Sequence, residues 1–158
     1  MQTVKKALAA LLAIAALAAG AFAAVGPIGS PGGPPTMDAA TVTVAFEWAI
    51  NVERGERGLP ALYIDQVESS QALAWSTLMA FTGTLAEDPH APAAIAAYDP
   101  SWQQESENVG VGVTPQSIEA AFMASAPHRA NILGAYTHVG VGVIVANGRI
   151  WITERFYR

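Results

Sequence analysis

The 158-residue sequence contains no cysteine, and its only lysines are Lys5 and Lys6 near the N-terminus. The lack of cysteine excludes disulfides, thiol catalysis and cysteine-ligated zinc. Beyond residue 23, six arginines stand against thirteen aspartates and glutamates, a formal net charge of 6 − 13 = −7. An acidic, lysine-free surface argues against nucleic acid or anionic lipid headgroups as partners. The chain must therefore be held together by a hydrophobic core, which about 135 residues are enough to form.

The N-terminus has the features of a secretory signal peptide. Two lysines precede an apolar run over residues 7–19, which is shorter than the roughly 20 residues of a membrane-spanning helix. Ala21-Phe22-Ala23 then provides a cleavage site of the A-x-A type. We therefore predict a secreted protein with a signal peptide over residues 1–23 and a Gly/Pro-rich linker over residues 24–37. After cleavage no transmembrane segment would remain; the alternative is an uncleaved segment that anchors the protein to the membrane.

Apolar periodicity and turn signals predict the elements of the remaining residues, 38–158. The expected helices lie over about 39–54, 69–82 and 115–125, with a short helical turn after Pro127. The expected strands lie over 105–113, 137–146 and 149–156, and residues 87–102 are expected to form a loop with a short alanine-rich turn. Asn147-Gly148 is typical of a type I′ hairpin turn. These elements predict an α+β fold, a three-layer α/β/α sandwich with a small antiparallel sheet.

Two runs alternate valine with glycine, over residues 109–113 and 139–143. Such alternation predicts two neighbouring strands whose glycine face lets a helix approach closely. Neither run opens a helix with the Gly-x-Gly-x-x-Gly spacing, which argues against a phosphate-binding loop.

Polar residues concentrate at three places in the sequence. Asn51 and Arg54, one turn apart near the end of the first helix, are expected to bond the loop that follows. Ser125-Ala126-Pro127-His128-Arg129-Ala130-Asn131-Ile132-Leu133 places a hydroxyl, an imidazole, a guanidinium and an amide within nine residues, and Glu107-Asn108 opens the upstream Gly/Val run. The function depends on whether His128 and Glu107 meet in one cleft.

These motifs resemble those of the CAP superfamily, in the cysteine-free bacterial branch of SCP domains. The family includes cysteine-rich secretory proteins, antigen 5 and plant pathogenesis-related proteins. The resemblance spans about residues 40–157 and rests on the segments 51–54, 58–62, 107–110, 125–133, 139–142 and 151–153. It implies that residues 38–158 form a secreted α/β/α sandwich with a central cleft. In many members two histidines and two glutamates of that cleft hold a divalent cation such as zinc; some members bind sterols or fatty acids, and no enzymatic activity is common to the family.

The resemblance carries over to the cleft only in part. His128 and Glu107 match one histidine and one glutamate of the family motifs. Glu87 stands where the first histidine is expected, with His90 three residues later, and Ser125 stands in place of the second glutamate. Because zinc takes three or four ligands, His128 and Glu107 would need Glu87 or His90 as a third. The stronger expectation is a charge-assisted hydrogen bond between His128 and Glu107.

The favoured function is the extracellular binding of a small apolar or cell-envelope ligand in a cleft formed by His128, Glu107, Ser125, Glu87 and His90. The alternative is a hydrolase in which His128 and Glu107 act with a metal or with Ser125. Ser125 and His128 are three residues apart and can share one face of a helix. The amides of Gly110 or Gly112 could form an oxyanion hole, but the chain has no Gly-x-Ser-x-Gly elbow. The sequence identifies neither the ligand nor the oligomeric state.

Overall fold

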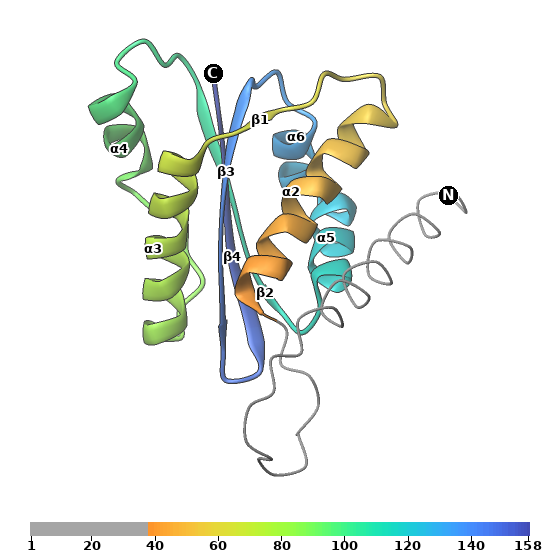
Figure 1. Cartoon of the computed structure of the whole chain (residues 1–158), viewed down its shortest axis with the longest axis vertical. Helices are drawn as coiled ribbons and strands as arrows, with labels where there is room; N and C mark the ends of the chain where they lie inside the picture. The colour runs from red at the N-terminus through yellow and green to blue at the C-terminus, as the bar shows by residue number, and fades with distance from the viewer. Residues whose placement is uncertain (1–37) are drawn as a thin grey trace, which may run out of the picture. The chain divides into compact units, whose positions relative to one another are not determined.

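A computed structural model describes residues 38–158, so the predicted signal peptide and linker lie outside the described residues. The elements are α2 (Ala39–Gly55), β1 (Tyr63–Ile64), α3 (Gln66–Thr82), α4 (Ala91–Tyr98), β2 (Glu105–Gly112), α5 (Pro115–Ala124), α6 (Ala126–Ile132), β3 (His138–Ala146) and β4 (Arg149–Tyr157). Helices α3 and α4 lie on one side of the sheet, and α2, α5 and α6 lie on the other (Figure 1). The predicted α+β sandwich is confirmed. None of the helices in these residues is long and apolar enough to cross a bilayer.

The sheet is mixed and has the strand order β1-β3-β4-β2. Strand β4 pairs antiparallel with both β3 and β2, whereas β1 pairs parallel with β3 through Tyr63 and His138. The sequence predicts only the antiparallel part, because two residues are too few to show the alternation of a strand. The prediction that the two Gly/Val runs are neighbouring strands is wrong, since β4 lies between β2 and β3.

Side-chain caps fix the starts of the helices. Asp38 caps α2, and Thr114 caps α5 directly before a proline at its first position, as the sequence predicts. Helix α3 begins at Gln66, three residues earlier than expected, because Asp65 accepts the first free N–H groups. The cap therefore lies upstream of Ser69, where the start was predicted.

The segments between the long elements also follow local signals. The expected alanine-rich turn is a full helix of eight residues, α4. Asn147 and Gly148 have φ angles of 52° and 70°, as a type I′ turn requires, so the predicted hairpin is confirmed.

Glycines on the sheet let helices lie directly against the strands. A Cβ at Gly142 would lie 2.0 Å from the backbone nitrogen of Leu73 on α3. A Cβ at Gly112 would lie 2.6 Å from the Ile118 side chain on α5. The expectation that the glycine faces admit helices is confirmed. The main core fills the space between the sheet and α2, α5 and α6, with Phe46, Ile50, Phe122, Ile132, Ile152 and Phe156 among its members.

Arg54 ties α2 to the segment that carries His128. Its Nε donates to the carbonyl of Pro60 at 2.9 Å, and its Nη1 donates to the carbonyls of Ile132 at 2.9 Å and Gly134 at 2.8 Å. Asn51 exchanges two hydrogen bonds with the backbone of Leu62, and the predicted bonding of the following loop is confirmed. The buried guanidinium therefore also fixes the end of α6.

Candidate functional site

Strand β2 separates the polar residues that the sequence places in one cleft. Successive side chains of a strand point to opposite faces of the sheet. Gly110 faces α5, and Asn108 lies on the same face of the sheet, where its Nδ2 donates to the carbonyl of His128 on α6 at 3.2 Å. Glu107 points to the other face, where its Oε1 accepts from the backbone N–H of Asp88 at 2.7 Å. The side chain of Glu107 therefore lies across the sheet from α5 and α6.

The predicted hydrogen bond between His128 and Glu107 is not formed. The Nδ1 atom of His128 pairs with the Oγ of Ser125 at 2.8 Å, and its ring lies against Phe122 with centroids 5.0 Å apart. The second oxygen of Glu107 accepts from Nε of Arg155 at 2.6 Å. The reason is the alternation of β2, which turns Asn108 rather than Glu107 toward α6.

A cavity of about 260 Å³ lies beside His128, along β2. We call it the β2 groove; its lining includes Leu85, Val109, Val111, Ile118, Phe122, Ser125 and His128. Ser125 joins the end of α5 to the start of α6, so it places His128 at the wall of the groove. The groove is mainly apolar, and Ser117, Ser125 and His128 supply its polar side chains.

The β2 groove follows the free edge of the sheet. Gln104 and Arg158 exchange two backbone hydrogen bonds, of 3.3 and 3.1 Å. Because backbone bonding alternates along an antiparallel strand, the even-numbered residues of β2 bond to β4 in the same way. The backbone N–H and C=O groups of the odd-numbered residues, including Val109 and Val111, point outward from the edge of the sheet, away from β4. The amides of Gly110 and Gly112, predicted as oxyanion donors, face β4 instead. Any such donor in the groove would come from the two valines.

The free edge is covered only over its first half. The carbonyl of Glu107 accepts from Nδ2 of Asn131 on α6 at 3.1 Å. Among residues 38–158, the outward backbone groups of Val109 and Val111 have no hydrogen-bond partner. The groove thus combines apolar walls with unpaired backbone donors and acceptors.

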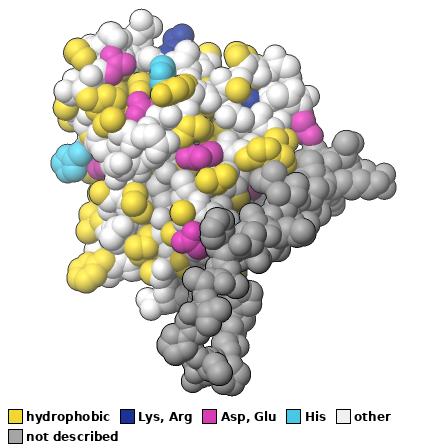
Figure 2. Space-filling view, viewed as in Figure 1, with side chains coloured by type: hydrophobic (Ala, Val, Ile, Leu, Met, Phe, Trp, Pro, Cys, Tyr) yellow, Lys and Arg dark blue, Asp and Glu magenta, His cyan; other side chains and the backbone are white. Residues whose placement is uncertain are grey.

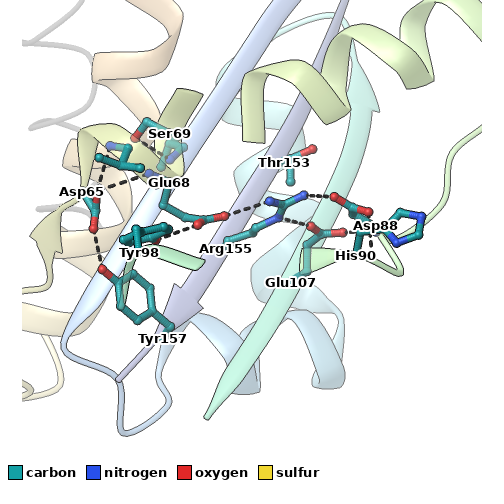
Figure 3. A network of polar contacts seen from close by, with 12 residues as sticks. Asp65, Glu68, Ser69, Asp88, His90, Tyr98, Glu107, Thr153, Arg155 and Tyr157 are labelled. Atoms are coloured by element: carbon teal, nitrogen blue, oxygen red, sulfur yellow. Dashed lines mark hydrogen bonds and ion pairs between the residues drawn. The ribbon is translucent and has the colours of Figure 1, made fainter. Parts of the chain in front are cut away.

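On the opposite face of the sheet, the guanidinium of Arg155 lies among three carboxylates (Figure 3). Its Nη1 donates to Glu68 at 2.8 Å, its Nε to Glu107 at 2.6 Å, and its Nη2 to Asp88. Burial alone would lower the pKa of Arg155, but the hydrogen bonds to Glu107 and Glu68 outweigh it and raise the pKa. Burial raises the pKa of Glu107, and its hydrogen bond to Arg155 opposes that rise. The cluster therefore holds a permanent buried cation.

The predicted metal ligands do not gather around one point. Glu107 is engaged by Arg155 and a backbone amide, and His128 lies on the other face of the sheet. Glu87 and His90 are exposed, and His90 starts α4 with its N–H bound to the carboxylate of Asp88 at 2.8 Å. Within residues 38–158, no group of three or more His, Asp or Glu side chains is placed to hold a metal ion. These residues do not fit the zinc site that the family resemblance implies; a guanidinium supplies the positive charge beside Glu107.

Two more buried carboxyl groups lie on the groove side of the sheet. Glu154 accepts from Nδ2 of Asn108 at 3.0 Å, while its other oxygen and both oxygens of Glu119 have no partner among the described residues. Burial raises the pKa of Glu154 well above its ordinary range. Burial, together with the charge of Glu53, raises the pKa of Glu119 to about 7. Glu119 therefore titrates near neutral pH, and the sequence patterns singled out neither carboxyl group.

Comparisons with known proteins agree with the fold. Residues 49–153 match the family model described as CAP, the cysteine-rich secretory protein family. The chain is 36% identical over 114 residues to the uncharacterised protein YkwD of Bacillus subtilis (strain 168). That match covers 67% of this chain and 43% of YkwD, so the chain spans less than half the length of that relative.

Two solved structures show the same fold. An outer surface protein of Borrelia burgdorferi matches with a TM-score of 0.69 and 16% identity, over 77% of this chain and 96% of that protein. An extracellular SCP-domain protein of Bacillus anthracis matches with a TM-score of 0.64 and 23% identity, over 80% of this chain and 45% of that protein.

Proposed function

The chain belongs to the CAP family of cysteine-rich secretory proteins, and we propose that it is a secreted protein that binds a small or surface-associated ligand in the β2 groove. The observation that carries this proposal is the apolar cavity with Ser125 and His128 in its wall. Its volume of about 260 Å³ lies just below the range of ligand sites, roughly 300–1,000 Å³. The ligand is therefore small, or it inserts only a short apolar part.

His128 gives the groove one polar anchor. Its Nδ1 is taken by Ser125, and its Nε2 has no hydrogen-bond partner among the described residues. A hydroxyl, carbonyl or carboxyl group of the ligand can pair with this nitrogen while the apolar part contacts Phe122 and Ile118. Glu107, Glu87 and His90 have no place in this site, because none of them lines the groove.

Native mass spectrometry of the protein purified from its host's culture medium tests the proposal. We expect a chain beginning near residue 24, which also tests secretion, with an additional retained mass. Ala121→Trp fills the groove and should remove that mass, because Ala121 lines the cavity. Ala120→Trp is the matched control, since Ala120 is exposed and lies outside the lining. Polypeptide mass alone in the wild type, or equal retention in both variants, would contradict binding in this groove.

A second candidate function is Ser-based hydrolysis, favoured by the 2.8 Å contact between Ser125 Oγ and His128 Nδ1. The N–H groups of Val109 and Val111 face the same groove and can serve as oxyanion donors. No glutamate orients the imidazole, however, because Glu107 bonds to Arg155 instead. A fluorophosphonate that labels the wild type but not Ser125→Ala would support hydrolysis, and a wild type that stays unlabelled would exclude it.

A further inference from the structure

The second half of strand β2 is an open edge. Edge strands with unpaired backbone groups are templates for another strand, and proteins commonly protect them with lysine, proline or a bulge. Residues 109–112 are Val-Gly-Val-Gly and carry none of these devices. The outward groups of Val109 and Val111 are two residues apart, about 6.6 Å along the strand. That spacing matches the donors and acceptors on one edge of another extended chain.

From the open edge, and resting on the proposed function, we propose that the ligand is an extended peptide that adds to β2 as a fifth strand of the sheet. Side chains of such a peptide alternate between the two faces. On one face they would meet Phe122 and Ile118, which lie over Gly110 and Gly112. On the other face they would meet Leu85 beside the valines. Both sets of side chains therefore find an apolar wall.

Backbone chemistry favours a peptide over a lipid chain. An acyl chain in the β2 groove would cover the N–H and C=O groups of Val109 and Val111 without bonding them, which costs free energy for each group. An extended peptide bonds all four. Main-chain bonds then supply affinity, and the apolar walls select the side chains, as in other cases of strand addition.

Charge sets the kind of peptide. Residues 38–158 carry thirteen acidic side chains and six arginines, and acidic side chains outnumber basic ones on the face shown in Figure 2. A second copy of the domain would carry the same net negative charge and be repelled, whereas a basic peptide is attracted. The occupant is thus a segment of about four apolar residues flanked by lysine or arginine, from another secreted or envelope protein.

The peptide acetyl-Lys-Val-Ile-Val-Ala-Lys amide tests this proposal against the full-length mature protein. Hydrogen exchange followed by NMR should show the amides of Val109 and Val111 at least tenfold slower with peptide. Gly110 and Gly112, already bonded to β4, are internal controls that should not change. The same peptide with methylated backbone nitrogens keeps its side chains but loses its donors, so it should bind at least tenfold more weakly.

Val111→Pro removes one outward N–H and leaves the bonds to β4 intact, as proline at a strand edge allows. It should weaken peptide binding at least tenfold. Equal binding of the methylated peptide would overturn strand addition and leave the proposed function standing.

Binding of 1-octanol in the groove without binding of either peptide would also overturn strand addition and leave the proposed function standing. Binding of none of these probes would overturn both proposals. If the Val109 amide exchanges more slowly as the protein concentration rises, without any peptide, the edge of β2 pairs with a second copy of the protein. That result would overturn the peptide proposal.

Discussion

The Nη1 atom of Arg155 and the Oε1 atom of Glu68 lie 2.8 Å apart, in an ion pair whose side chains are 1% and 0% exposed. The pair joins β4 to α3, and the same guanidinium also holds Glu107 of β2 and Asp88 of the loop between α3 and α4. One buried cation thus organises three segments on the face of the sheet opposite the groove.

Replacing Arg155 by methionine should destabilise the protein by about 3–5 kcal/mol, because two buried carboxylates and the partly buried one of Asp88 lose their counter-charge. Urea unfolding at pH 7 measures this loss. Arg149→Met is the matched control: Arg149 lies on the same strand but is exposed, so it should cost no more than about 0.5 kcal/mol. Equal small losses for both variants would contradict a structural role of the cluster.

Zinc should leave the protein unaffected. Its candidate ligands His128 and Glu107 bond to different partners and occupy opposite faces of the sheet. We expect the melting temperature to change by less than about 1 °C with a large excess of zinc, because only binding to the folded state stabilises it. The His128→Ala variant should respond in the same way. A zinc-dependent rise in the wild type that disappears in this variant would show that His128 is a ligand after all.

Stability should fall as pH rises through the titration of Glu119. Its folded-state pKa of about 7 lies above the unfolded value of about 4.3. Between these values the folded protein binds more protons than the unfolded chain, so this contribution is complete below about pH 4 and is lost as pH rises through 7.

Glu119→Met removes this dependence. At pH 8 we expect the variant to be more stable than the wild type by on the order of 1–3 kcal/mol, and the difference should shrink toward pH 5. Thermal unfolding at four pH values measures it, with the exposed Glu56→Met as control. An unchanged pH slope in the Glu119 variant would show that this carboxyl is not the titrating group.

Gly142→Ala should cost about 3 kcal/mol or more, because its Cβ would lie 2.0 Å from the backbone of α3 and overpacking against backbone forces the helix to move. Gly55→Ala is the comparison, since no atom lies within 4 Å of the added Cβ. Chemical denaturation of the two variants distinguishes them. Tolerance of alanine at 142 would mean that α3 lies farther from the sheet.

Local signals predicted most of the fold. Thr114 before a proline and the Asn147-Gly148 turn each define an element boundary through their own hydrogen bonds or φ angles. Strand β1 could not be predicted, because its two residues become a strand only through pairing with β3. The partners of Arg155 could not be predicted either, because they come from three separate segments of the sequence that only the folded chain brings together.

The candidate site was predicted only in part, although a usable signal was present. Alternation along residues 107–113 groups Glu107 with the valines and Asn108 with the glycines. Since the glycine face admits a helix, the same pattern indicates that Asn108, and not Glu107, faces the segment with His128. Matching Glu107 by motif alone ignores the direction of its side chain. The proximity of Ser125 to His128 followed from their spacing.

The strand order has a consequence for the synthesis of the protein. Strand β4 follows β2 and β3 in the sequence but lies between them in the sheet. On the ribosome, β2 and β3 therefore have no common partner until residues 149–157 have been made. A nascent chain that lacks β4 has no completed sheet and no buried Arg155 pairs to resist unfolding. The complete sheet can therefore form only after β4 has been synthesised.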